Sequence, residues 1–213
     1  MLSGMTGLRE RKKQQTRQAI AESARRLFTE RGFEHVTVGE IARAADVSEQ
    51  TVFNYFPTKE DLVYWRLGTF EQELLGAVRT RAEGESALTA FRRFLLAQRG
   101  LLGDHDEAAS AQLVAFTRMI AESRALQQRE AQILDGYTAA LAALLAEQAG
   151  AAPGALEPSV VASALVGVHR SLIAYTRGRI LAGESGPGLA RDVRARAERA
   201  FALLEGGLAD YPR

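Results

Sequence analysis

The 213-residue sequence contains no cysteine, which excludes disulfides and thiolate metal ligands and suits a reducing compartment. It also has no run of about 18 uncharged apolar residues, so a membrane-spanning segment is not expected. The opening MLSGMTGLRERKK has no apolar core before its charges and does not read as a secretory signal. We therefore expect a cytoplasmic protein that does not associate with a membrane.

The alternating polar and apolar pattern of a half-buried strand is also missing from every stretch of useful length. Apolar residues instead recur three and four positions apart, as they do on one face of a helix. Breaks rich in glycine, serine and proline separate the helical segments, so the sequence predicts an all-α fold of about nine helices. The expected helices cover residues 9–31, 37–45, 48–56, 58–81, 86–102, 107–121, 124–149, 159–181 and 189–208.

Charge is distributed unevenly, although the formal net charge is only +1. Residues 1–33 carry eight basic and three acidic side chains, a local charge of +5, which leaves −4 for the rest of the chain. A basic end on an acidic body suits a phosphate-binding surface, and a solvated helix face is the alternative.

Residues 37–62 have the pattern of two short helices joined by a tight turn. Thr37 begins a capping box for the first helix, and Ser48 caps the second, which leaves a short turn around Asp46. Pro57 ends the second helix because the residue before a proline avoids helical angles. Two helices in this arrangement form a helix-turn-helix, whose second helix can lie in the major groove of DNA.

The second helix of this pair divides into an inner and an outer face. Val52 and Phe56 lie four positions apart and can pack inward, which leaves the remaining side chains free to meet DNA. Hydroxyl and ammonium groups near the helix ends can donate to backbone phosphates. The candidate base readers are Glu49, Gln50, Phe53 and Asn54, and the candidate phosphate donors are Thr37, Tyr55 and Lys59.

The stretch TVGEIARAADVSEQTVFNYFPTKEDL carries these features and resembles the helix-turn-helix of the TetR family of bacterial transcription regulators. The resemblance covers residues 9–80 and is only architectural beyond them. Asp46 stands where the family usually has glycine, for which we expect a small stability cost and no change of fold. The resemblance implies phosphate contacts by Thr37, Thr51, Tyr55 and Lys59 and base contacts by Glu49, Gln50 and Phe53; Ser48 and Asn54 complete the predicted DNA-binding set.

The same resemblance implies a DNA-binding domain at residues 1–57 and a larger helical domain at residues 58–213, which dimerises and binds a small-molecule effector. The segment SVVASALVGVHRSLIAYTRGRI supports dimerisation, because its apolar residues spread over more than one helical face. We predict a homodimer that forms through the last two helices. A helix fully buried in a monomer core is the alternative.

The effector site is expected among the fourth to eighth helices, where most apolar side chains will form core. For Trp65 and for His169, packing without ligand contact is the alternative. The segment GESALTAFRRFLL resembles regulators thought to sense acyl-coenzyme A, so the expected effector is acyl-CoA or another apolar or amphipathic compound. The candidate ligand residues are Trp65, Phe70, Leu74, Phe91, Phe94, Phe116, Met119, Tyr137, His169 and Tyr175.

These predictions combine into a ligand-responsive repressor that binds double-stranded operator DNA, requires no cofactor and is not an enzyme. A constitutive DNA-binding protein without an effector is one alternative. A helical enzyme with a metal site in the run DHDE at residues 104–107 is another, although adjacent side chains cannot all converge on one ion.

Overall fold

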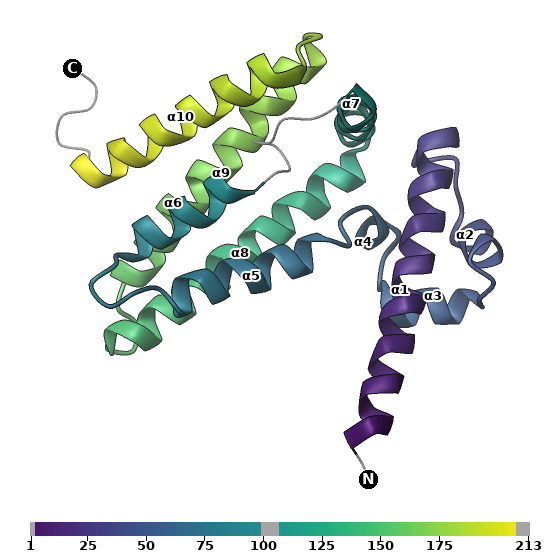
Figure 1. Cartoon of the computed structure of the whole chain (residues 1–213), viewed down its shortest axis with the longest axis horizontal. Helices are drawn as coiled ribbons and strands as arrows, with labels where there is room; N and C mark the ends of the chain where they lie inside the picture. Colours follow the sequence, from purple (N-terminus) through teal and green to yellow (C-terminus); the bar gives the residue numbers. More distant parts are fainter. Residues whose placement is uncertain (1–2, 99–106, 208–213) are drawn as a thin grey trace. The chain divides into compact units, whose positions relative to one another are not determined.

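The computed structural model describes residues 3–98 and 107–207 of the chain (Figure 1). Within those residues it contains ten α-helices and no strand, which confirms the predicted all-α class. The helices are α1 (Ser3–Arg31), α2 (Val38–Ala44), α3 (Glu49–Tyr55), α4 (Lys59–Val63), α5 (Leu67–Arg79), α6 (Ala87–Ala97), α7 (Glu107–Glu122), α8 (Arg124–Ala149), α9 (Glu157–Leu181) and α10 (Gly186–Gly206).

The tenth helix arises because the single helix predicted for residues 58–81 is divided into α4 and α5. Tyr64 ends α4 with φ −97° and ψ 18°, and the amide of Leu67 donates to the Tyr64 carbonyl at 2.8 Å. The buried Tyr64 hydroxyl donates to the carbonyl of Leu126 at 3.0 Å. Because that partner is 62 positions away, no local sequence pattern could have indicated this contact.

Contacts divide the chain into two compact units. Unit 1 comprises Met1–Leu67 and Met119–Glu130, and unit 2 comprises Gly68–Arg118 and Ala131–Arg213. Unit 1 thus extends beyond residue 57, where the predicted DNA-binding domain ends, and includes the end of α7 and the start of α8.

Unit 1 has its core where α1 packs against α2 and α4, and α2 packs against α3. The periodicity predicted for α1 holds, because Ile20, Ala24 and Phe28 are buried on one face. Phe28 also contacts Phe33, with ring centroids 5.2 Å apart. This core supports the short helices α2 and α3, which bury only two residues and one residue of their own.

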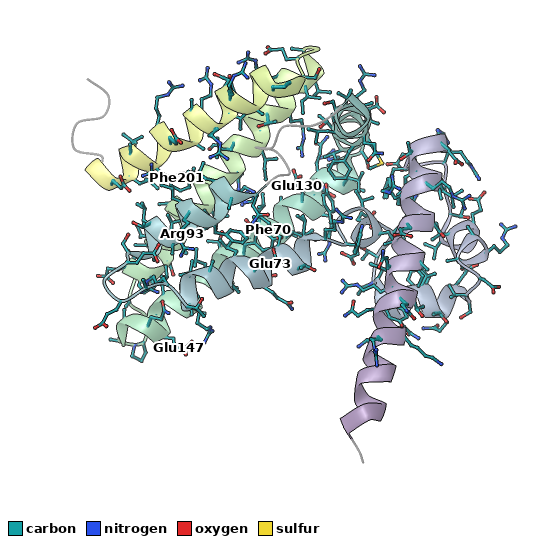
Figure 2. All side chains as sticks on the ribbon, in the orientation of Figure 1. Phe70, Glu73, Arg93, Glu130, Glu147 and Phe201 are labelled. Atoms are coloured by element: carbon teal, nitrogen blue, oxygen red, sulfur yellow. The ribbon has the colours of Figure 1, made fainter. Side chains whose placement is uncertain are left out.

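Unit 2 is built around α9, which packs against α6 and α10, and α10 also packs against α6. Phe91 of α6 and Phe201 of α10 are fully buried with ring centroids 6.1 Å apart (Figure 2 labels Phe201). The helix α9 buries one face but leaves Val160, Val161 and Leu181 exposed.

Candidate nucleic-acid interface and ligand site

The start of α2 is fixed by the capping box that the sequence predicts. The Glu40 amide donates to the Thr37 hydroxyl at 3.3 Å, and the Thr37 amide donates to the Glu40 carboxylate at 2.8 Å. Arg31 forms an ion pair with the same carboxylate. The hydrogen bond from the Thr37 backbone, with Arg31 second, lowers the pKa of Glu40 to about 2, so Glu40 is ionised at neutral pH.

The turn between α2 and α3 is short because Asp46 adopts a left-handed conformation, with φ 52°. Asp46 alone among the described non-glycine residues has a positive φ, and aspartate tolerates this region better than most residues. The Val47 amide then donates to the Ala42 carbonyl at 3.0 Å, and the Ser48 hydroxyl accepts from the Thr51 amide at 3.1 Å. The helix α3 therefore begins at once after the turn, as a helix-turn-helix requires.

The two faces of α3 are divided as the sequence predicts. Val52 and Phe56 are buried, each 1% exposed. Phe53 is 43% exposed, although burying an aromatic ring away from water is normally favourable. The other exposed side chains are Glu49, Gln50 and Asn54, and the Gln50 amide donates to Asn54 at 3.2 Å.

Amide, carboxylate and apolar groups on one exposed helical surface are those that read base edges in a major groove. Their assignment as readers stays a prediction.

Glycine at position 39 is a feature of this surface that the sequence did not reveal. A Cβ placed on Gly39 would lie 2.6 Å from Glu49 Oε1. Glycine at this position therefore leaves room for the Glu49 carboxylate against the first turn of α2. A larger residue at this position would displace Glu49, one of the predicted base readers. Only the packing of α2 on α3 shows this relationship.

The predicted phosphate donors all lie in unit 1 and keep part of their surface exposed. Lys59 has its ammonium 4.2 Å from the ring centroid of Phe33, a cation–π contact. Partial burial lowers the pKa of Lys59, although nearby Glu34, Glu60 and Glu40 act in the opposite direction. The remaining predicted donors are Thr37, Thr51 and Tyr55, and Ser48 of the predicted DNA-binding set is also exposed.

Arg17 is a further cation near these residues that the sequence did not single out. Its guanidinium lies 5.5 Å from the ring centroid of Phe56, the residue that ends α3. The Nε atom of Arg17 is buried without a hydrogen-bond partner. The sequence shows a basic residue within the first helix and an aromatic residue at the end of α3. Their contact could not be predicted, because it depends on how α1 packs.

Three polar contacts join the end of α7 and the start of α8 to the rest of unit 1. Besides the Tyr64 hydrogen bond to Leu126, the Ser123 hydroxyl donates to Glu34 at 2.7 Å. Arg129 forms an ion pair with Asp61 at 2.8 Å. The predicted ligand residues Trp65 and Met119 also belong to unit 1, where Arg66 lies 5.0 Å from the Trp65 ring centroid.

Four of the predicted ligand residues come together in unit 2. Phe70 of α5 lies at the centre, with ring centroids 5.3 Å from Phe94 of α6, 5.8 Å from Tyr137 of α8 and 5.1 Å from His169 of α9. Figure 2 labels Phe70 among these helices. Tyr137 and His169 are buried, whereas Phe70 and Phe94 are half-buried. We call these four residues the ring cluster.

Burial controls the titration of both polar members of the ring cluster. It lowers the pKa of His169 to about 4, so the imidazole is neutral at pH 7, and its Nδ1 atom has no hydrogen-bond partner. Burial, with a smaller contribution from Glu71, raises the pKa of Tyr137 above its usual value.

The remaining predicted ligand residues lie elsewhere in unit 2. Leu74 and Phe91 are buried, Phe91 against Phe201, and Phe116 is 39% exposed. The Tyr175 hydroxyl donates to Asp192, within a cluster of ion pairs that links α9 to α10. Their roles as ligand residues stay predictions.

A groove of about 350 Å³ lies between α8 and α9, and none of the predicted ligand residues lines it. Asp135 and Arg170 form an ion pair of 2.7 Å there, and most of the other lining side chains are small. In the sequence, the signal for such a groove was a series of small and hydroxyl-bearing residues at helical spacing along the segments that form α8 and α9. The lining residues are Asp135, Thr138, Ala139, Ala142, Ser159, Ser163, Val166, Gly167 and Arg170.

The metal site considered at residues 104–107 falls mainly outside the described residues, since 104–106 are not described and Glu107 begins α7. In the part of the chain that the structure covers, no group of three histidine or carboxylate side chains is placed to hold a metal ion.

Sequence comparisons connect the helix-turn-helix region to known regulators. Residues 20–64 match the family model described as bacterial regulatory proteins, tetR family. The HTH-type transcriptional regulator TcmR of Streptomyces glaucescens is 37% identical over 84 residues, which are 39% of this chain and 37% of TcmR. The fatty acid metabolism regulator protein of Bacillus subtilis (strain 168) is 28% identical over 60% of this chain and 65% of that protein. Neither alignment reaches two thirds of the relative's own length.

Solved structures extend the similarity of the fold over most of the chain. NalD, described as the secondary repressor of the MexAB-OprM multidrug efflux pump in Pseudomonas aeruginosa, is 22% identical with a TM-score of 0.54, covering 89% of this chain and 96% of that one. GusR of Salmonella enterica is 22% identical with a TM-score of 0.50, covering 90% of this chain and 94% of that one. At these identities the structures show a shared fold. The family match therefore covers the helix-turn-helix region, and the solved structures share the fold over most of the chain.

Proposed function

We propose that the protein is a homodimeric, cytoplasmic transcriptional repressor that leaves its operator DNA when a small apolar or amphipathic effector binds. The observation that carries this proposal is the exposed surface of α3, held behind a capped, left-handed turn. Such a helix fits the major groove, and its neighbours supply donors for the phosphate backbone.

The division of labour at the DNA follows from the chemistry of each side chain. The Gln50 amide can form paired hydrogen bonds with adenine, Glu49 can accept from the amino group of cytosine, and Phe53 can contact a thymine methyl group. Lys59 supplies a charge for the phosphate backbone. Its position on the Phe33 ring removes part of its hydration before DNA arrives, which reduces the dehydration that contact with a phosphate requires.

The outer face of α9 supports the homodimer. By length and a mean hydropathy of 1.2, α9 could even cross a membrane, yet only 39% of its most apolar window is buried within the chain. A Cβ placed on Gly167 or on Gly178 would meet no neighbouring atom within 4 Å, so space for a second helix remains there. We infer that α9 of a second copy covers this face, with α10 flanking it.

A heptad stripe of small or apolar residues runs along this uncovered face: Val160, Ala164, Gly167, Ser171, Ala174, Gly178 and Leu181. Small side chains at this spacing allow two helices to approach closely. A dimer would also present two copies of α3, which can read half-sites about 34 Å apart or a multiple of that distance.

The route from effector to DNA runs through the helices that both units share. Met119–Glu130 belongs to unit 1, whereas the rest of α7 and α8 belongs to unit 2. An effector at the ring cluster would meet Tyr137 of α8, and a shift of α8 would change the Tyr64–Leu126 and Asp61–Arg129 contacts. The effector can disfavour DNA binding only by binding the released form more tightly.

The chemical class of the effector follows from the ring cluster, which offers aromatic surface and little charge. Acyl-CoA is one candidate, and the similarity to a relative named for fatty acid metabolism supports a hydrophobic compound. No part of this proposal requires a cofactor or a catalytic step.

The first experiment tests the DNA interface with fluorescence anisotropy on DNA from the protein's own promoter. Lys59→Ala should weaken binding to all sequences alike and flatten the slope of log affinity against log salt by about one. Arg191→Ala removes one exposed positive charge from unit 2 and should leave the slope unchanged. An unaltered slope for Lys59→Ala would remove Lys59 from the interface.

The second experiment tests the switch by titrating cell metabolites into the protein–DNA complex. A coupling of about 1–3 kcal/mol would weaken operator binding roughly 5- to 150-fold, and operator DNA must weaken effector binding by the same factor. Phe70→Ala should reduce effector affinity and leave effector-free operator binding nearly intact. Equal effector affinity with and without operator, measured by calorimetry, would instead identify a constitutive DNA-binding protein.

A further inference from the structure

The imidazole of His169 is the least explained polar group in unit 2. It lies on α9, is 7% exposed, and stacks on Phe70 with an interplanar angle of 29°. Its Nδ1 atom is buried and has no hydrogen-bond partner. Packing alone does not account for it, because an apolar side chain would fill the same space without a buried polar atom.

The surroundings keep this imidazole uncharged. Burial is the only cause that shifts its pKa, to about 4, so no described carboxylate offsets the loss of hydration. A neutral imidazole carries one donor and one acceptor nitrogen. Whichever tautomer is present, Nδ1 can bond to a hydroxyl group, which is both donor and acceptor.

The aromatic residues around His169 provide a surface that a ligand could reach. Phe70 and Phe94 are half-buried, so two members of the ring cluster keep part of their surface exposed. Phe70 stacks on Tyr137 as well as on His169, with interplanar angles of 27° and 29°. Near-parallel rings favour a flat, apolar ligand, which can stack against the half-buried rings.

We propose that His169 is the polar anchor of the effector site and that the effector is a flat, apolar molecule with an uncharged hydroxyl group bonded to Nδ1. This inference rests on the proposed function, because it assigns the effector to the ring cluster. A carboxylate in the same place would lose its hydration without an opposite charge to compensate, and the charge of Glu71, which acts on Tyr137, would repel it. The site therefore selects against anionic ligands.

A matched series of naphthalenes tests the anchor in the full-length protein by calorimetry at pH 7. The probes are 2-naphthol, naphthalene and naphthalene-2-carboxylate, which share one ring system and differ in a single substituent. Wild-type protein should bind 2-naphthol about tenfold or more tightly than either of the other probes, the effect of one buried hydrogen bond. In the same samples, 2-naphthol should weaken operator binding.

Three variants separate the anchor from its neighbours. His169→Phe keeps a ring against Phe70 and should abolish the preference for 2-naphthol over naphthalene. Tyr137→Phe removes the other hydrogen-bonding group of the ring cluster and should retain that preference. His169→Asn restores a hydrogen-bonding group and should recover part of the preference, which keeps the test valid if His169→Phe folds poorly.

The inference is overturned if the carboxylate binds as tightly as 2-naphthol, if none of the probes binds, or if Tyr137→Phe and not His169→Phe removes the preference. Operator binding without ligand is measured in parallel. Wild-type protein that binds operator but fails the naphthalene series contradicts only the anchor, whereas wild-type protein that binds no promoter DNA contradicts the proposed function.

Discussion

The two units of this protein define their helices in different ways. In unit 1, Thr37, Ser48 and Thr58 each accept a backbone hydrogen bond at the start of a short helix. In unit 2, the long helices α9 and α10 begin at Leu156 and Ser185 without any side-chain cap. Side-chain caps therefore mark the starts of three short helices in unit 1, whereas in unit 2 the packed pair α9 and α10 starts without one and α6 is capped by Ser86.

The same contrast separates the candidate functional groups. The predicted base readers on α3 are exposed, and all except Phe53 are polar, so their chemistry is visible in the sequence. The ring cluster of unit 2 is largely buried, and its one unsatisfied polar atom emerges only from tertiary packing. Exposed polar side chains are easier to recognise in a sequence than a polar atom that packing leaves buried and unpaired.

Removing a large buried side chain from unit 2 should give the largest effect. Phe201→Ala should lower the free energy of unfolding by about 3–5 kcal/mol, because Phe201 is fully buried against Phe91. Phe53→Ala is the matched control, since Phe53 is 43% exposed and its loss should change stability by less than about 0.5 kcal/mol. Urea denaturation at fixed protein concentration measures the free energy of unfolding of both variants. Equal losses would contradict the contrast between the buried core of unit 2 and the exposed surface of α3.

Removing a cap should distinguish the two units directly. Ser48→Ala should cost about 1 kcal/mol of stability, because the Ser48 hydroxyl accepts from the Thr51 amide at 3.1 Å. Ser185→Ala makes the same chemical change at the start of α10, where no side-chain cap exists, and should have little effect. Thermal and urea denaturation of both variants provide the comparison, and a larger loss for Ser185→Ala would refute it.

The pH dependence of unit 1 should contain a contribution from Glu40. Its pKa is about 2 in the folded protein and 4.5 ordinarily, so its stabilising effect is complete above pH 4.5 and is lost as pH falls toward 2. Glu40→Gln should flatten the stability curve in that window. Denaturation followed between about pH 2 and pH 6 tests this, and an unchanged curve would show that the capping box does not depend on the charge.

The smallest expected effect concerns the turn of the helix-turn-helix. Asp46→Gly should raise stability by up to about 1 kcal/mol, because glycine adopts the left-handed conformation with φ 52° without a steric cost. Asp46→Ala should lower stability, since alanine tolerates that region less well than aspartate. A loss of stability in Asp46→Gly, measured by urea denaturation, would mean that the aspartate side chain contributes more than its backbone costs.

Structural features with a local cause could be predicted from the sequence. The capping boxes at Thr37 and Thr58, the cap at Ser48 and the inward packing of Val52 and Phe56 all follow from residues within a few positions of one another. The all-α class also follows, because hydrophobic periodicity is a local pattern.

Features whose cause is distant along the chain could not be predicted in this way. The hydrogen bond from Tyr64, where α4 ends, to Leu126 joins residues 62 positions apart, and the position of Glu49 depends on the absent side chain of Gly39. The ring cluster was predicted as four separate candidates, but its geometry and the unpaired Nδ1 atom of His169 required the packing of four helices.

The outer stripe of α9 has a consequence for how such a regulator stays separate from its paralogues in one cell. Small, uncharged side chains fit many similar surfaces, so the stripe that would hold the proposed dimer together carries little information about which subunit it meets. One charge beside it is Arg179, which follows Gly178 of the stripe and pairs with Asp192, the residue that also binds Arg196 and the Tyr175 hydroxyl. A change to these charges would therefore alter the edge of the proposed dimer and, at the same time, the surroundings of Tyr175, one of the candidate ligand residues.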